Sequence, residues 1–140
     1  MTNRATPSRW AAGKTLVTRF VAVLIGILTA SASAWAAEEI PYREFLSRNS
    51  ASSSKLSLGM TREQVLGVMG DLRSEVRDGQ LANPWKVEAF LRGEDAVEVL
   101  YYLVRGHPPF TPILQNQAIS VVLKNGKLVA WGRNADAGFR

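Results

Sequence analysis

The stretch that decides the fold is Ala96-Val97-Glu98-Val99-Leu100-Tyr101-Tyr102-Leu103-Val104. Every residue in it except Glu98 is apolar, and most are β-branched or aromatic, the types that strands favour. Neighbouring side chains of a strand point to opposite faces, so apolar residues at both odd and even positions predict a strand with two apolar faces. The rest of the chain must supply whatever covers those faces.

Three further strands are expected on either side of this one. The four expected strands are Trp85–Leu91, Ala96–Val104, Ala118–Lys124 and Lys127–Gly132. Polar residues 92–95 form a turn between the first two, and Asn125-Gly126 between the last two is a strong hairpin signal. Residues 106–112 hold three prolines, which excludes an interior strand and predicts a loop. The sequence therefore predicts an antiparallel meander.

Two short helices are expected before the meander. Residues 59–70 carry a complete helix signature: Thr61 can cap the first turn, Gln64 can complete a capping box, and Gly70 can end the helix. Residues 40–48 also predict a short helix, because Tyr42, Phe45 and Leu46 fall on one face. Residues 49–55 are almost all small or polar, which predicts a flexible linker.

The expected fold class is α+β: two short N-terminal helices packed on a three- to four-stranded antiparallel meander as a two-layer sandwich. The expected boundaries are a signal peptide at 1–36, a helix and flexible linker at 37–55, the α+β domain at 56–135 and a tail at 136–140. One face of the meander should pack on the helices. The other should be covered by the N-terminal segment or offered to a partner.

The first 36 residues predict an export signal. Four basic residues and no acid occur in residues 1–19, the apolar run Phe20–Leu28 follows, and small residues lead to Ala34-Trp35-Ala36. This order predicts signal-peptidase cleavage after Ala36, with Ala34 as an alternative. An uncleaved anchor is the other interpretation, although the apolar run is short for a membrane span. We therefore expect a periplasmic protein, with membrane contact only if the signal is retained.

Composition excludes several classes of partner and chemistry. The net charge of +5 falls to +1 in residues 37–140, where 13 bases face 12 acids, so no nucleic-acid partner is expected. The chain has no cysteine, so we expect no disulfide, no thiolate metal site and no lipid anchor. A single histidine, His107, argues against a metal site or a catalytic triad. No cofactor is expected.

No catalytic residue is assigned, and we expect no enzyme. A paired-carboxylate site formed by Glu88 and Glu98 is conceivable, because both lie on the first expected hairpin. Solvent-facing acids are the alternative explanation. The candidate interaction residues are four aromatic side chains of the meander and its long loop, namely Trp85, Tyr101, Phe110 and Trp131.

Three motifs in order resemble the SmpA/OmlA (BamE-like) family of small bacterial envelope domains and a related group of uncharacterised exported domains. They are Gly59-Met60-Thr61-x-x-Gln64-Val65-x-x-x-Met69-Gly70, then Asn83-Pro84-Trp85 with Val97–Tyr102, and finally Asn125-Gly126-Lys127-Leu128-Val129-x-Trp131-Gly132. The resemblance covers about residues 56–132.

The resemblance implies helices on one sheet, shared in outline with small β-lactamase-inhibitor domains, and a non-enzymatic envelope role. The characterised members are lipoproteins of the outer-membrane β-barrel assembly machinery. The missing lipidation cysteine leaves membership of that machinery open. We expect a periplasmic protein-interaction domain whose partners are envelope proteins. It could support outer-membrane protein assembly or envelope integrity, and it could associate with the outer membrane. The alternative is an inhibitor or sensor domain that binds a secreted enzyme.

Overall fold

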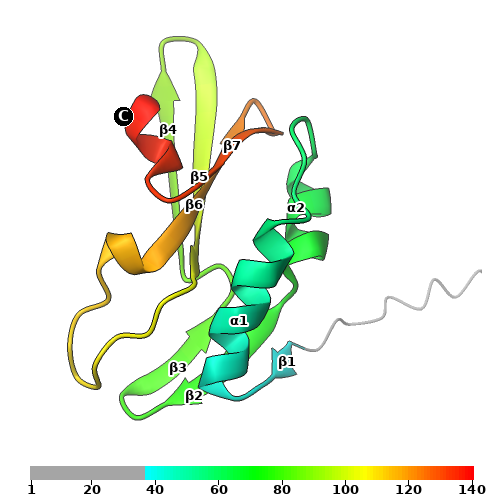
Figure 1. Ribbon diagram of the computed structural model, residues 1–140. Helices are drawn as coiled ribbons and strands as arrows, with labels where there is room; N and C mark the ends of the chain where they lie inside the picture. Colours follow the sequence, from blue (N-terminus) through cyan, green and yellow to red (C-terminus); the bar gives the residue numbers. More distant parts are fainter. Residues whose placement is uncertain (1–36) are drawn as a thin grey trace, which may run out of the picture. The chain divides into compact units, whose positions relative to one another are not determined.

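A computed structural model describes residues 37–140 (Figure 1). This part of the chain contains two α-helices and seven strands, and the strands form two sheets. The expected signal segment, including Ala34 and Ala36, lies outside the described residues. The elements in order are β1 (Glu38–Glu39), α1 (Tyr42–Ser53), α2 (Arg62–Met69), β2 (Leu72–Val76), β3 (Gly79–Ala82), β4 (Lys86–Arg92), β5 (Asp95–Leu103), the 3₁₀ turn η1 (Gln115–Gln117), β6 (Ala118–Lys124), β7 (Lys127–Gly132) and the 3₁₀ turn η2 (Ala135–Gly138). No described helix is both long and apolar enough to span a bilayer.

The expected fold class, two N-terminal helices on a single meander, is wrong. A second sheet of order β1-β2-β3 lies beside the four-stranded sheet, and 36 residues and β1 precede the first helix. Strand β1 is two residues long and pairs in parallel with β2, so no local sequence pattern predicts it. The β2–β3 hairpin buries only Leu72, Ser74 and Leu81, too few apolar positions to display a clear period.

The strands expected from residue 85 onward are confirmed. They form the antiparallel sheet β4-β5-β6-β7; β6 and β7 have the expected ends, and β4 and β5 are each displaced by one residue. Asn125 and Gly126 both have positive φ, 50° and 77°, as the tight hairpin between β6 and β7 requires. The proline-containing segment is a loop, also as expected.

Strand β5 is buried on both faces, and each face has its own apolar cluster. The six residues Val97 and Val99–Leu103 are at most 2% exposed. The odd-numbered ones pack with Ile40, Phe45 and residues of β2 and β3. Leu100 and Tyr102 pack with α2. The face opposite α2 is therefore covered by Ile40, α1 and the unforeseen second sheet, so the expectation that both helices pack on one face of the meander is wrong.

Helix α2 has the expected caps, and the segment just before it protects one edge of the four-stranded sheet. The Thr61 hydroxyl accepts a hydrogen bond from the Gln64 N–H (3.2 Å), and the Gln64 side chain accepts from the Thr61 N–H (2.8 Å). Gly70 ends the helix with φ of 77°. Just before the helix, the N–H of Gly59 donates to the carbonyl of Leu128 (2.8 Å), so the outer edge of β7 is occupied.

The segment expected as a flexible linker is largely helical, because α1 continues to Ser53. The last turns of α1 contain weak helix formers, so tertiary contacts must keep this segment helical. Asn49 supplies these contacts from a fully buried position. The expected tail is also structured: η2 turns back onto the sheet and buries Asp136.

Asn49 and Asn83 form a reciprocal amide pair that joins three parts of the fold. Asn49 Nδ2 donates to Asn83 Oδ1 (3.1 Å), and Asn83 Nδ2 donates to Asn49 Oδ1 (2.7 Å). Asn49 Nδ2 also donates to the carbonyl of Leu103 at the end of β5 (2.9 Å). Asn83 Nδ2 lies within 3.3 Å of the Gly70 carbonyl at the end of α2. Buried amides are tolerated only when they are paired in this way.

Replacing Asn49 by Ala should therefore destabilise the protein strongly. The Leu103 carbonyl and the Asn83 amide would lose their partner in the interior, at a cost of about 2–4 kcal/mol in the free energy of unfolding. Urea denaturation followed by circular dichroism measures this cost. Ser50→Ala, on an exposed position of the same helix, is the matched control and should change stability by less than about 0.5 kcal/mol. Equal effects of the two substitutions would contradict a joining role for Asn49.

Candidate functional site

The four aromatic candidates occupy different environments, and only Phe110 is mostly exposed. Tyr101 is fully buried, and Trp85 lies edge-on against its ring with centroids 6.5 Å apart. Trp131 is partly buried against the cluster beneath α2. The Phe110 side chain is 73% exposed. The candidate site is therefore the loop that carries Phe110, between β5 and β6.

Phe110 sits in a tight turn and has an unusual backbone conformation. The Thr111 N–H and hydroxyl both donate to the Pro108 carbonyl, at 3.3 and 2.6 Å, which closes a turn around Pro109 and Phe110. Proline followed by a residue of positive φ is the arrangement of a type II turn. The φ of Phe110 is 59°, a region that residues with a Cβ rarely occupy. The turn thus holds a large apolar side chain in solvent at a conformational cost.

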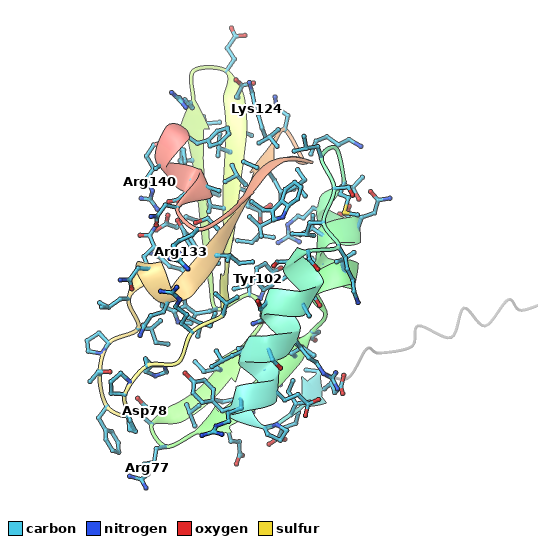
Figure 2. All side chains as sticks on the ribbon, viewed as in Figure 1. Arg77, Asp78, Tyr102, Lys124, Arg133 and Arg140 are labelled. Atoms are coloured by element: carbon cyan, nitrogen blue, oxygen red, sulfur yellow. The ribbon has the colours of Figure 1, made fainter. Side chains whose placement is uncertain are left out.

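The β2–β3 hairpin supports the turn from one side. The N–H of Phe110 donates to Asp78 Oδ2 (3.2 Å). Figure 2 shows Asp78 at the tip of this hairpin beside the loop, whereas Arg77 points away from it. The second sheet, which the sequence did not predict, therefore positions the loop.

The base of the loop is fixed to α1 and to its own C-terminal end. The His107 N–H donates to the Tyr42 hydroxyl (3.1 Å), which also lies 3.0 Å from His107 Nδ1. The two rings meet edge to face, with centroids 5.9 Å apart. Gln117 Nε2 donates to the Gly106 carbonyl (3.1 Å), and the Leu114 N–H donates to Gln117 Oε1 (2.7 Å). His107 is thus a structural residue at the base of the loop.

Two hollows lie between this loop and the β2–β3 hairpin. The larger, about 280 Å³, is lined by apolar and polar side chains that include Val76, Trp85, Thr111 and Ile113. The smaller, about 140 Å³, is bordered by Tyr42, the charged stretch 75–78 and Pro109. An exposed aromatic knob beside partly apolar hollows with a charged rim is the composition of a protein-binding surface. We call Phe110 and these two hollows the Phe110 site.

A second group of polar residues surrounds the buried hydroxyl of Tyr101, and its contacts assign it a structural role. Asp136 is 2% exposed and accepts hydrogen bonds from Ser120 Oγ (2.6 Å), Gln115 Nε2 (2.9 Å) and Arg140 Nε (2.7 Å). The Tyr101 hydroxyl lies 3.1 Å from the same carboxylate and 2.9 Å from Glu88. Figure 2 shows Arg140 alongside the four-stranded sheet. Both oxygens of Asp136 are thus engaged in fixing η2 to the sheet.

This polar group shifts the ionisation of its members. Burial by itself would raise the pKa of Asp136, but hydrogen bonds from Ser120, Arg140 and Tyr101 outweigh burial and lower the pKa to about 2. Burial is the main cause that raises the pKa of Tyr101, and the neighbouring Glu88 adds to the rise. A hydrogen bond from Lys86 is the main cause that lowers the pKa of Glu88. The group therefore combines ionised carboxylates with a neutral tyrosine at neutral pH.

The conceivable carboxylate pair of Glu88 and Glu98 is not formed. In the β4–β5 register Glu88 lies opposite Val99 and Glu98 lies opposite Ala89, so the two acids point to opposite faces of the sheet. Each is paired with a base on its own face: Glu88 with Lys86 (2.6 Å) and Glu98 with Arg62 (2.9 Å). Among residues 37–140, no three acidic or histidine side chains are grouped closely enough to hold a metal ion.

Asp136 should make stability depend on acid pH. A carboxyl pKa of about 2 in the folded protein, against 3.8 in the unfolded chain, corresponds to roughly 2 kcal/mol. Because the folded pKa is the lower one, this stability is present above about pH 4 and is lost as the pH falls toward 2. Urea denaturation between pH 5 and pH 2.5 should therefore show a smaller decline for Asp136→Asn than for the wild type. Arg140→Gln keeps the carboxyl but removes a cation that lowers its folded pKa, so its decline should begin at the same pH as in the wild type but be smaller and end at a higher pH. Identical profiles for all three proteins would refute this role.

The backbone conformation of Phe110 predicts that Gly is more stabilising than Ala at this position, the reverse of the usual order. At most positions Ala is more stabilising than Gly, because Gly gives the unfolded chain more conformational entropy, which is lost on folding. At φ of 59° we expect Phe110→Gly to be more stable than Phe110→Ala by about 1 kcal/mol, since only Ala has a strained Cβ. Thermal unfolding of both variants tests this. The same pair at Thr111, which has no positive φ, is the control and should show the ordinary order, with Ala above Gly.

Comparison with protein-family models, with curated proteins and with solved structures finds no match to this chain. The geometry of the Phe110 site and the patterns in the sequence are therefore what bears on function.

Proposed function

We propose that this protein is an exported, non-catalytic interaction domain of the bacterial envelope that binds another envelope protein through the Phe110 site. The observation that carries the proposal is the exposure of Phe110 in a braced turn with positive φ. A 73% exposed phenylalanine gains nothing for folding, and its backbone conformation costs stability. Side chains maintained at such a cost cluster at binding sites.

The place of action follows from the first 36 residues and from the three motifs that resemble the SmpA/OmlA family. Basic residues, an apolar run and Ala34-Trp35-Ala36 support export and cleavage. We therefore place the protein in the periplasm, with an association with the outer membrane as part of the proposal. A role in outer-membrane protein assembly agrees with the resemblance. The second sheet separates this chain from the simple helix-on-meander fold that the resemblance implies.

The shape of the Phe110 site also favours a second candidate, an inhibitor or sensor of a secreted enzyme. Phe110 projects from a turn stiffened by Pro108, Pro109 and Pro112 and held by Asp78. A rigid projecting loop loses little conformational entropy on entering a cleft, which is how small inhibitors reach high affinity. The two candidates share one surface and differ in the partner.

Site-specific photocrosslinking in living cells tests both candidates. A photoreactive phenylalanine analogue at position 110 should crosslink to one or a few exported proteins. The same analogue at Leu58, which is 68% exposed in a different loop, is the matched control and should not. Phe110→Ala should reduce co-purification of the captured partner at least tenfold, because exposed aromatic anchors contribute about 1.4 kcal/mol or more to binding.

The identity of the captured protein separates the candidates. An outer-membrane or assembly protein supports the envelope role, and a soluble secreted enzyme supports the inhibitor role. Equal crosslinking from positions 58 and 110, or none from either, would overturn the proposal.

A further inference from the structure

The two edges of the four-stranded sheet differ. The edge at β7 is occupied, because Gly59 donates to Leu128 and the Leu128 N–H donates to the Met60 carbonyl (both 2.8 Å). At the other end of the order β4-β5-β6-β7, no described segment pairs with the outer side of β4. An unpaired edge strand presents a row of backbone donors and acceptors that can bind another strand.

Strand β4 also exposes an apolar stripe on one face. Val87, Ala89 and Leu91 alternate along the strand, and Val87 and Leu91 are 46% and 76% exposed. Val87 lies opposite Leu100, so the stripe is on the α2 face of the sheet. The cluster beneath α2 includes residues of β5, β6 and β7 but none of β4. A hollow of about 420 Å³, lined in part by Ala89, Leu91 and Ala96, continues the stripe along the sheet.

We propose that β4 pairs in antiparallel fashion with β4 of a second copy of this chain, about a two-fold axis at Phe90. In this register Glu88 lies opposite Arg92 of the second copy, and Ala89 lies opposite Leu91. Each copy supplies the same contacts to the other, as a two-fold interface requires. The pairing joins the two sheets into one continuous sheet and brings the two apolar stripes together.

Charge complementarity selects the occupant and the register. Pairing centred on Ala89 would place Lys86 opposite Arg92, and pairing centred on Glu88 would place two glutamates opposite each other. Pairing centred on Leu91 would place Glu88 opposite Glu94. The register centred on Phe90 avoids these like-charge contacts and forms two Glu88–Arg92 pairs. A register centred on Val87 would pair Lys86 with Glu88, but only residues 86–88 of β4 would then face β4 of the second copy. Opposite charges that face each other across strands stabilise pairing, and like charges oppose it. The charges on β4 are thus complementary to those of a second copy in this register.

Glu88 and Arg92 both reach the surface, and Glu88 also contacts Lys86, Arg140 and the Tyr101 hydroxyl of its own chain. The Glu88 side chain is 25% exposed, and Arg92 is exposed at the end of β4. Arg92 already reaches across one face of the sheet to the carbonyl of Gly138, so its guanidinium is held on the face that Glu88 shares. This surface is on β4, apart from the Phe110 site, and it does not depend on the proposed function.

Sedimentation velocity of the protein over a range of concentrations tests the dimer. We expect a monomer–dimer equilibrium, and Arg92→Glu should raise the dimer dissociation constant at least tenfold, because Glu88 then faces a glutamate at both ends of the pairing. Leu91→Lys, at a 76% exposed position, should weaken the dimer without disturbing the fold. Arg105→Glu makes the same charge change on an exposed residue outside β4 and should have no effect. A monomer up to about 1 mM, or a dimer insensitive to both β4 variants, would overturn the proposal.

Cysteine crosslinking tests the register in a chain that has no cysteine of its own. In Ala89→Cys/Leu91→Cys each introduced thiol faces its counterpart in the other copy, so mild oxidation should produce a disulfide-linked dimer on a non-reducing gel. Each single variant places its thiol opposite an unchanged side chain and should crosslink at least tenfold more slowly. Rapid crosslinking of Ala89→Cys alone would mean that the axis lies at residue 89, and the proposed register would be wrong.

Discussion

Strand β5 has no face left for solvent, and most of the described fold can be understood as the covering of its two faces. Its odd-numbered residues from Val97 to Leu103 need one apolar layer, and Leu100 and Tyr102 need another. Burying side chains of this size contributes about 1.5–3 kcal/mol each, so both layers are required for stability. Helix α2 provides the second layer. The first is assembled from Ile40, α1, the small sheet and η2, which are distant in sequence.

Polar groups inside these layers fix the elements that apolar contact alone would leave free to slide. The Asn49–Asn83 pair ties α1 to the end of β5 and to the chain that leaves the small sheet. Asp136 does the same for η2 through Ser120, Gln115 and Arg140. Apolar packing is non-directional, whereas these hydrogen bonds have a defined geometry. Each also penalises any arrangement that leaves a buried polar group unpaired.

The same architecture separates two surfaces with different properties. The Phe110 site is built where the long β5–β6 loop meets the β2–β3 hairpin, and it combines an aromatic knob with hollows and charges. The β4 edge offers unpaired backbone groups beside an apolar stripe. The two surfaces are therefore built from different segments of the chain.

Much of the fold and part of the site could be predicted from local patterns. The capping box at Thr61, the Asn125-Gly126 turn and the four strands after residue 85 each depend on neighbouring residues, and the structure agrees with them. Phe110 was one of four aromatic candidates, and the sequence did not distinguish it from the buried Tyr101. The small sheet, the full length of α1 and the burial of Asp136 were missed. A two-residue parallel strand, the serine-rich end of a helix and a short polar turn carry no periodic signal.

The amino-acid sequence by itself determined which segments form strands and turns after residue 85 and where α2 begins and ends, because hydrogen bonds and apolar spacing within a few residues are sufficient for these. Tertiary structure alone decided that Glu88 and Glu98 point to opposite faces, that Tyr101 is buried while Phe110 is exposed, and that β7 is covered while β4 is open. The directions of the two glutamates depend on the register of the β4–β5 hairpin. The burial of Tyr101, the position of Phe110 and the covering of β7 depend on contacts between residues 30 or more positions apart. Such contacts form only when distant segments of the chain come together, which costs chain entropy that local patterns do not reveal.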